Sequence, residues 1–274
     1  MVHKLNSVFL TPPPGPSMAE QLSGSTPQTS AVIVLNWKLP KISTTVLEQA
    51  SICVCADGGA NRLYDEIPKL LPNEDAAAVR KRFMPHVIAG DLDSVRDDVR
   101  EYYGSLGVPV VDLSHDQDST DLMKSIDFLT NSGAWKEHDA LSRVKESLGG
   151  GAHPEYNVIV ALGAHGGRLD HILGNLSILH MYRDIPLVLC GDGNVTRLVR
   201  RGQTEITPSP MEGPMCGLVP LGGQATASST GLKWNLKDTK MQIGGLVSTC
   251  NRIQDATVWI ESDADLVWTT ELTE

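Results

Sequence analysis

From residue 31 to about residue 193, short apolar runs alternate with segments of helical periodicity, and this feature narrows the choice of fold most. Six runs have the length and the apolar content that are typical of buried parallel strands. They lie at residues 31–35, 52–56, 86–89, 108–111, 157–162 and 186–190. Helical spacing of apolar residues appears between strands, as at Leu122, Ile126 and Leu129, and over residues 169–179. The alternation predicts an α/β fold, an open and mostly parallel sheet with flanking helices, which binds ligands at the carboxyl ends of its strands.

From about residue 194 the helical periodicity stops. Short β-rich runs now lie between Gly, Ser and Thr turns, at residues 217–220, 246–249, 256–260 and 266–268. This pattern predicts a second, all-β domain with the architecture of a sandwich. We therefore expect an α/β domain at residues 31–193 and a β-sandwich domain at residues 194–274.

Three polar stretches stand outside this pattern. Residues 1–30 contain a Pro-rich run and a Ser/Thr/Gln tract, and such a composition cannot bury a core. We expect residues 1–30 to be a disordered leader. Residues 68–84 and 132–154 are expected to be polar insertions, the first helical and the second a helix that ends in a flexible loop.

Composition excludes several functional classes. The share of hydrophobic residues, 41%, is that of a globular protein, and a net charge of −10 argues against binding to nucleic acid or to an anionic membrane. No apolar run has the length of a membrane span. The five cysteines show no CxxC pair and no zinc spacing, which indicates reduced thiols and a cytoplasmic protein. A chain this acidic needs local positive charge or a metal ion to bind a polyanion.

Acidic residues follow two of the predicted strands. Asp91 and Asp93 come directly after one strand, and Asp116, Asp118 and Asp121 precede a predicted helix. Asx turns or a helix cap would explain one or two of these acids. They do not explain three acids within six positions, where a bound cation would relieve the mutual repulsion. Since Mg²⁺ prefers carboxylate and phosphate oxygens, the sequence favours a magnesium site here.

Two strand-to-helix turns are rich in glycine, at residues 57–62 and 163–168. Glycines let the backbone approach a phosphate, and a helix N-terminus supplies N–H donors. Arg168 could bind phosphate oxygens with two parallel hydrogen bonds. The alternative is that neither turn binds a ligand. Residues 163–168 would then be a tight turn with Arg168 on the surface, and residues 57–62 a tight turn in which Asp57 caps the helix. In the β domain, Trp234 is either a core residue or a platform for a flat cationic ring.

Six segments in register resemble the thiamin pyrophosphokinase (thiamine diphosphokinase) family, in its eukaryotic form. They are CADGGANRLYD, AGDLDS, DQDSTD, LGAHGGRLDH, GLKWNL and LVSTCN, and they spread over most of residues 32–268. The resemblance implies an enzyme that transfers a pyrophosphoryl group from ATP to the hydroxyl of thiamine. It also implies a Mg²⁺ requirement and a homodimer whose active sites lie at the subunit interface.

The resemblance and the motifs together give a set of expected site residues. The metal ligands are Asp91, Asp93 and Asp121, which with Arg168 form the expected catalytic group. Asp118 or Asp170 is expected to accept the proton of the thiamine hydroxyl. The expected ATP-binding residues are Asp57, Gly58, Gly59, Asn61, Gly167 and Arg168. The expected thiamine-binding residues are Gln117, Trp234, Ser248 and Asn251, with Trp234 supplied by the partner subunit.

The sequence departs from the family pattern at Leu92, His165 and Cys250, none of which is an expected ligand. Two other functions use the same features. A Mg²⁺-dependent nucleotide pyrophosphatase would need the acids and the arginine but no aromatic acceptor pocket. A non-enzymatic nucleotide- or vitamin-binding module would need the pockets but not the costly cluster of carboxylates.

Overall fold

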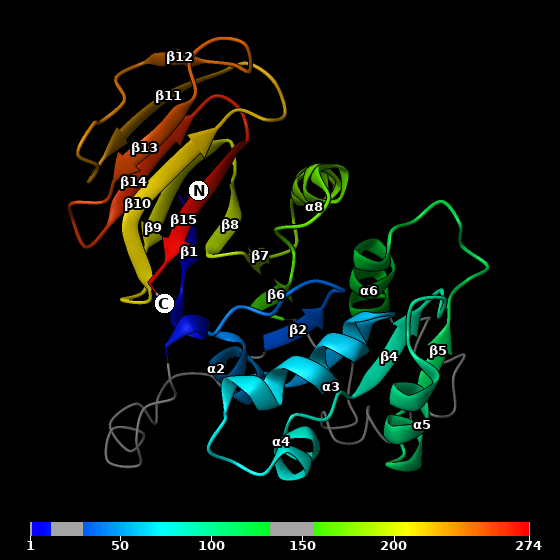
Figure 1. Ribbon diagram of the computed structural model, residues 1–274. Coiled ribbons are helices and arrows are strands. Elements are labelled where there is room, and N and C mark those ends of the chain that lie inside the picture. Colours follow the sequence, from blue (N-terminus) through cyan, green and yellow to red (C-terminus); the bar gives the residue numbers. More distant parts are fainter. Residues whose placement is uncertain (1, 12–29, 132–155, 274) are drawn as a thin grey trace.

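The computed structural model describes residues 2–11, 30–131 and 156–273, which form two β-sheets and the helices that cover one of them (Figure 1). The strands are β1 (Val2–Asn6), β2 (Ser30–Val34), β3 (Ile52–Ala56), β4 (Val87–Gly90), β5 (Val110–Asp112), β6 (Val158–Leu162), β7 (Leu187–Gly191), β8 (Asn194–Val199), β9 (Gly202–Thr207), β10 (Glu212–Val219), β11 (Ala225–Thr230), β12 (Thr239–Met241), β13 (Ser248–Arg252), β14 (Val258–Ser262) and β15 (Leu266–Leu272). The helices are η1 (Val8–Leu10), α2 (Ser43–Glu48), α3 (Gly59–Leu70), α4 (Ala76–Arg82), α5 (Asp97–Ser105), α6 (Asp121–Thr130) and α8 (Leu169–Met181).

The larger sheet has ten strands in the order β13-β10-β15-β8-β7-β6-β2-β3-β4-β5. Strands β2 to β7 are mutually parallel, and they coincide with the six apolar runs, so the predicted parallel sheet is confirmed. Their residues are apolar throughout because both faces are covered. Val32 and Val34 pack into one core, and Ala31 and Ile33 into the other. Helices α2 to α5 cover the first face, and α6 and α8 cover the second.

The second sheet has the order β1-β9-β14-β11-β12 and packs on the antiparallel end of the larger one. A third core joins the two sheets: Leu218 and Trp268 come from the larger sheet, and Ile206 and Ile260 from the smaller. This confirms the β-rich C-terminal domain. The larger sheet is continuous across the expected boundary at residues 193 and 194, since β7 and β8 form an antiparallel hairpin there.

Residues 2–10 form a strand and a short helix, so for this part of residues 1–30 the prediction of disorder is wrong. Strand β1 pairs in parallel with β9, and Phe9 and Leu10 are buried in the first core. The prediction failed because the Pro-rich tract dominated the composition of residues 1–30 and hid a short strand that needs a distant partner. Residues 12–29 and the insertion at 132–154 lie outside the described residues, whereas helix α4 confirms helical structure in the first insertion.

Within the described ranges, no helix is both long and apolar enough to cross a membrane.

Candidate active site

The order of the parallel strands marks one edge of the sheet for ligand binding. The chain runs from β2 through β3 and β4 to β5 on one side, and then returns to place β6 and β7 on the other side of β2. The direction of winding therefore reverses between β2 and β6. Open α/β sheets bind ligands in the crevice at the carboxyl ends of the strands beside such a reversal. The acidic and glycine-rich segments of this domain follow β3, β4, β5 and β6, so they lie at this same edge of the sheet.

Four carboxylates gather near the carboxyl end of β4. Gly90 ends this strand, and a methyl group added to it would lie 3.2 Å from Asp121 Oδ1 and 2.9 Å from Asp57 Cβ. Burial, together with the negative charges of Asp57, Asp91 and Asp93, raises the pKa of Asp121 to about 6. The structure thus brings the expected metal ligands of two separate segments into one electrostatic cluster, and it adds Asp57 to them.

Lys124 is the counter-charge of this cluster, and sequence reasoning missed it. Its ammonium forms an ion pair with Asp91, and the residue is 5% exposed although it is a lysine. It lies on α6 one turn after Asp121, so the two side chains share a helix face. An i, i+3 spacing of this kind is common among surface pairs on helices, so it does not by itself mark the lysine as part of a site. One ammonium facing four carboxylates leaves an excess of negative charge that fits a divalent cation.

The carboxylates of the acid cluster are not arranged as the ligands of a metal ion in this structure. Within the described ranges, no three His, Cys, Asp or Glu residues are arranged to hold a metal ion. Asp91 is engaged with Lys124, and Asp93 accepts a hydrogen bond from the Ser94 hydroxyl at 2.8 Å. Binding of a cation by Asp91 would require that carboxylate to leave Lys124 or to share its oxygens between the two.

Asp57 shapes the loop that carries Asp91 and Asp93. It is 2% exposed, and its carboxylate accepts hydrogen bonds from the backbone N–H groups of Ser94 and Val95, the closest at 3.0 Å. Burial raises the pKa of Asp57 despite these bonds. Asp57 itself has a φ of 45°. Backbone strain of this kind concentrates at functional sites, where the surrounding structure enforces it.

Glycines 58 and 59 and Asn61 hold neighbouring loops close together. A methyl group on Gly59 would lie 1.9 Å from the carbonyl oxygen of Val34, so this turn requires glycine. Asn61 donates to the carbonyl of Ser94 at 2.9 Å and accepts from the N–H of Arg96 at 3.0 Å. These expected ATP-binding residues therefore lie next to the loop that carries Asp91 and Asp93.

The segment before α6 is exposed. Gln117 donates to the carbonyl of Ser114 at 2.6 Å, and Asp116 accepts from the N–H groups of Asp118 and Ser119. The N-cap of α6 is Thr120, which accepts from the Met123 N–H at 3.3 Å, so the helix cap is a threonine and none of the three acids serves as it. A threonine one residue before the helix places its oxygen better than an acid two residues further out.

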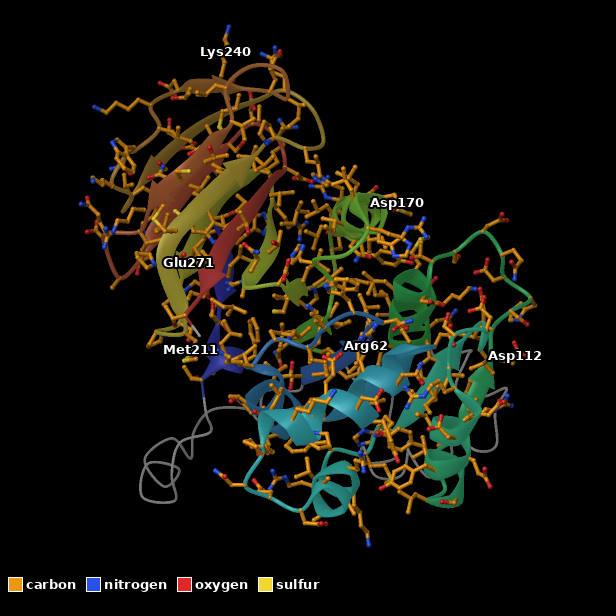
Figure 2. All side chains as sticks on the ribbon, in the orientation of Figure 1. Arg62, Asp112, Asp170, Met211, Lys240 and Glu271 are labelled. Atoms are coloured by element: carbon orange, nitrogen blue, oxygen red, sulfur yellow. The ribbon has the colours of Figure 1, made fainter. Side chains whose placement is uncertain are left out.

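Arg168 lies at the N-terminus of α8 and points to solvent. Its side chain is 71% exposed and pairs with Asp170, with an Nε–Oδ1 distance of 3.1 Å. Figure 2 shows Asp170 on α8, and its side chain is 62% exposed. Arg168 therefore stands at the same sheet edge as the acid cluster, with its charge turned towards Asp170.

The three expected thiamine residues of the β domain form one small cluster. Trp234 is 56% exposed, so in a single chain it is not a core residue. Asn251 is buried and its amide is fully used: Oδ1 accepts from the N–H groups of Trp234 and Arg252, and Nδ2 donates to the carbonyl of Trp234 and to Ser248 Oγ. In this arrangement Asn251 and Ser248 shape the loop, and Trp234 presents the surface.

The Trp234 cluster lies apart from the acid cluster of its own chain. Trp234 stands in the connection between β11 and β12, and Figure 1 shows these strands at the far end of the β domain from β4 and α6. A site that uses both clusters cannot form within one chain in this arrangement.

Comparisons with known proteins agree for both parts of the chain. The family model of the thiamin pyrophosphokinase catalytic domain matches residues 44–189, and that of the thiamin pyrophosphokinase vitamin B1 binding domain matches residues 203–267. Thiamine pyrophosphokinase 1 of Oryza sativa subsp. japonica is 43% identical over 96% of this chain and 93% of its own length. Thiamine pyrophosphokinase 1 of Arabidopsis thaliana is 43% identical over 89% of this chain and 87% of its own. Among solved structures, thiamin pyrophosphokinase from Candida albicans superimposes with a TM-score of 0.75 at 25% identity, over 99% of this chain and 93% of that one.

Proposed function

The chain belongs to the thiamin pyrophosphokinase family, and on that basis we propose which of its residues carry out the reaction. The enzyme transfers a pyrophosphoryl group from ATP to the hydroxyl of thiamine, which gives thiamine diphosphate and AMP. The two alternatives, a nucleotide pyrophosphatase and a binding module without catalysis, are not supported, because both domains match this one family of transferases.

The acid cluster is the proposed place of Mg²⁺. The observation that carries this assignment is the gathering of Asp57, Asp91 and Asp93 around the partly buried Asp121, whose pKa is raised first by burial and then by their negative charges. Asp91, Asp93 and Asp121 would hold the ion, and Asp57 would hold their loop in place. When bound, Mg²⁺ supplies positive charge to the phosphate oxygens of ATP during transfer.

The remaining groups bind and orient the two substrates. Gly58, Gly59 and Asn61 lie where a nucleotide can approach the backbone, and Gly167 and Arg168 face the phosphates when Arg168 releases Asp170. Phosphoryl transfer depends on positioning and charge neutralisation more than on covalent help, which suits this set. Gln117 lies beside thiamine, and an exposed carboxylate, Asp118 or Asp170, accepts the hydroxyl proton.

The functional unit is a homodimer in which Trp234 of the partner subunit completes each site. The separation of the two clusters within one chain supports this. Exposed apolar side chains on α8 and around the Trp234 cluster also support the homodimer. They are those of Leu169, Leu173, Ile243 and Leu246. Their exposed fractions run from 49% to 68%, high for residues of this size on a monomer surface.

The cytoplasm is the proposed compartment. All five cysteines are free, and four of them are buried, as expected for a reducing environment. Fluorescence microscopy of the tagged protein tests this assignment.

One assay tests the reaction and its metal. Purified protein is incubated with thiamine, ATP and Mg²⁺, and thiamine diphosphate and AMP are followed by chromatography. Equal amounts of both products, lost in EDTA and restored by excess Mg²⁺, are expected. AMP and free pyrophosphate with unchanged thiamine would instead establish the pyrophosphatase, and full turnover in EDTA would exclude the metal role of the acid cluster.

A further inference from the structure

The indole of Trp37 lies along the glycine-rich loop that follows β6. A methyl group added to Gly166 would lie 2.1 Å from the indole Nε1, and one added to Gly167 would lie 2.9 Å from the six-membered ring. The φ angles of these two glycines are 99° and 71°, in the region that glycine adopts freely. The loop backbone therefore lies against the ring. Its path depends both on the position of the ring and on the positive φ angles of the two glycines.

Trp37 reaches this position because of the strand reversal at β2. It stands three residues after the end of β2, and the N–H of Leu35 donates to the carbonyl of Leu162 at the end of β6, at 2.9 Å. A methyl group on Gly163 would lie 3.1 Å from the Trp37 carbonyl oxygen. The ring thus lies beyond the carboxyl end of β2 and against the loop that follows β6, beside the strand reversal at which ligands bind in sheets of this type.

The neighbouring residue connects the same segment to the acid cluster. A methyl group on Gly58 would lie 2.3 Å from the side-chain amide of Asn36 and 3.1 Å from Ser94 Cβ. Residues 35–37 therefore contact the acid side of the site through Asn36 and the loop before α8 through Trp37. No motif in the sequence singles out either residue.

We propose that Trp37 is a positioning residue for ATP: its ring sets the path of the Gly163–Gly167 loop, and hence the approach of Arg168 and the loop N–H groups to the triphosphate. This inference rests on the proposed role of Gly167 and Arg168. The indole N–H is buried and has no partner among the residues that the structure describes, so within them the ring acts by its shape and not by a hydrogen bond.

Kinetics of two Trp37 variants test the proposal. Trp37→Ala removes the support of the loop, and we expect the KM for ATP to rise about tenfold or more, since a displacement near 1 Å can cost two orders of magnitude. The KM for thiamine is expected to stay within about twofold, because thiamine binds to other residues. Trp37→Phe keeps a flat ring against both glycines and should restore most of the ATP affinity. Trp259→Phe, on the exposed face of β14, is the matched control and should behave as wild type.

Three outcomes would overturn the proposal: an unchanged KM for ATP in Trp37→Ala, equal rises in both KM values, or no rescue by Trp37→Phe. The Arg168→Ala variant distinguishes a failure of the Trp37 proposal from a failure of the proposed ATP site. If Arg168→Ala weakens ATP and Trp37→Ala does not, only the role of Trp37 is lost. If neither variant changes the KM for ATP, the loop does not bind the triphosphate.

A double-mutant cycle measures the contact without turnover. Gly166→Ala should weaken the binding of a non-hydrolysable ATP analogue, measured by calorimetry, more strongly in the wild type than in Trp37→Ala. The strain from the positive φ is present in both backgrounds and cancels in the cycle. Gly174→Ala on α8 has open space around its added methyl and should be additive with Trp37→Ala. Additive behaviour of Gly166→Ala as well would contradict the proposal.

Discussion

The side-chain amide of Asn251 forms two hydrogen bonds with the backbone of Trp234, one with its N–H and one with its carbonyl. Its Nδ2 donates to the Trp234 carbonyl at 2.9 Å, and its Oδ1 accepts from the Trp234 N–H at 3.2 Å. Asn251 is 3% exposed, whereas the tryptophan is 56% exposed. With the two further bonds to Ser248 and Arg252, every hydrogen-bonding position of the amide is occupied. Asn251 therefore influences a ligand through the placement of Trp234.

The first prediction separates the roles of these two residues. Trp234→Ala should raise the KM for thiamine about tenfold or more, because a flat cationic ring loses its aromatic partner, and should leave the KM for ATP within about twofold. Its melting temperature should change little, since the indole is exposed. Asn251→Ala should raise the KM for thiamine and also lower the melting temperature, because it leaves the Trp234 N–H and carbonyl without partners. Equal effects of Trp234→Ala on both substrates would point to a general structural role.

The second prediction concerns the shared active site. Asp93→Asn and Trp234→Ala disable different halves of the site, so each variant alone should be nearly inactive at low thiamine. When the two are unfolded and refolded together, half of the dimers contain both chains and one intact site, and about a quarter of wild-type activity should return. The same mixture of Asp93→Asn with Asp121→Asn, which damage the same half, is the control. No recovery in the first mixture would contradict a site built from two subunits.

The third prediction uses the raised pKa of Asp121. Because the folded pKa is about 6 and that of an unfolded aspartate about 3.9, the charged form opposes folding at neutral pH. Asp121→Asn should therefore raise the melting temperature of the metal-free protein at pH 7 by a few degrees while abolishing turnover. The gain should shrink as the pH falls from about 6 to 4, where the wild-type carboxyl becomes protonated. A gain that is constant with pH would show that the charge is not its source.

The fourth prediction concerns Lys124. Lys124→Met leaves Asp91 without its partner, and because the Asp91 side chain is 30% exposed, the loss should cost less than the roughly 3–5 kcal/mol of a fully buried pair. The metal-free variant should melt well below the wild type, and added Mg²⁺ should stabilise it more than it stabilises the wild type. Lys4→Met removes a pair with Glu205 in which the lysine side chain is 74% exposed, and it should have almost no effect. An equal Mg²⁺ effect in wild type and Lys124→Met would mean that the lysine and the cation do not share the cluster.

Much of the α/β domain could be predicted from the sequence because its signals are local. Strands such as β2 and β6 are buried on both faces and therefore read as continuous apolar runs. Asp91 and Asp93 were found because they directly follow a strand, and Asp121 because it stands with other acids before a predicted helix; parallel strands bring their carboxyl ends to one edge.

Other features depend on contacts between distant segments, which leave no local pattern. Lys124 looks like any helical lysine until β4 places Asp91 beside it, and Trp37 has no motif around it. Strand β1 is recognisable only by its pairing with β9, about two hundred residues away. The continuous sheet across the two domains is a further case, because nothing in β7 or β8 alone specifies that they pair.

The last prediction concerns the buried ion pair that fastens the start of the chain. Arg197 donates to Glu212 and to the hydroxyl of Ser7, each at 2.5 Å, and Thr270 also donates to Glu212. Burial alone would raise the pKa of Glu212, but Arg197 and the hydroxyls of Ser7 and Thr270 hold it below its ordinary value. A lowered pKa stabilises the fold above about pH 4.3, the value of an unfolded glutamate, and this contribution is lost as the pH falls further.

Glu212→Gln should therefore lower the melting temperature strongly at pH 7, since it leaves the Arg197 charge buried and unpaired, at a cost of about 3–5 kcal/mol. The difference from wild type should narrow as the pH falls from about 4.3 towards the lowered pKa of the wild-type carboxylate, because the unfolded chain takes up its proton first. Hydrogen exchange should show faster exchange of the β1 backbone in this variant, because the charge that holds Arg197, which itself donates to Ser7, is gone. Glu205→Gln, which breaks the surface pair with Lys4, is the control and should leave both the melting temperature and the exchange of β1 close to wild type. If the two variants behaved alike, the buried pair would not be what holds residues 2–10 on the β domain.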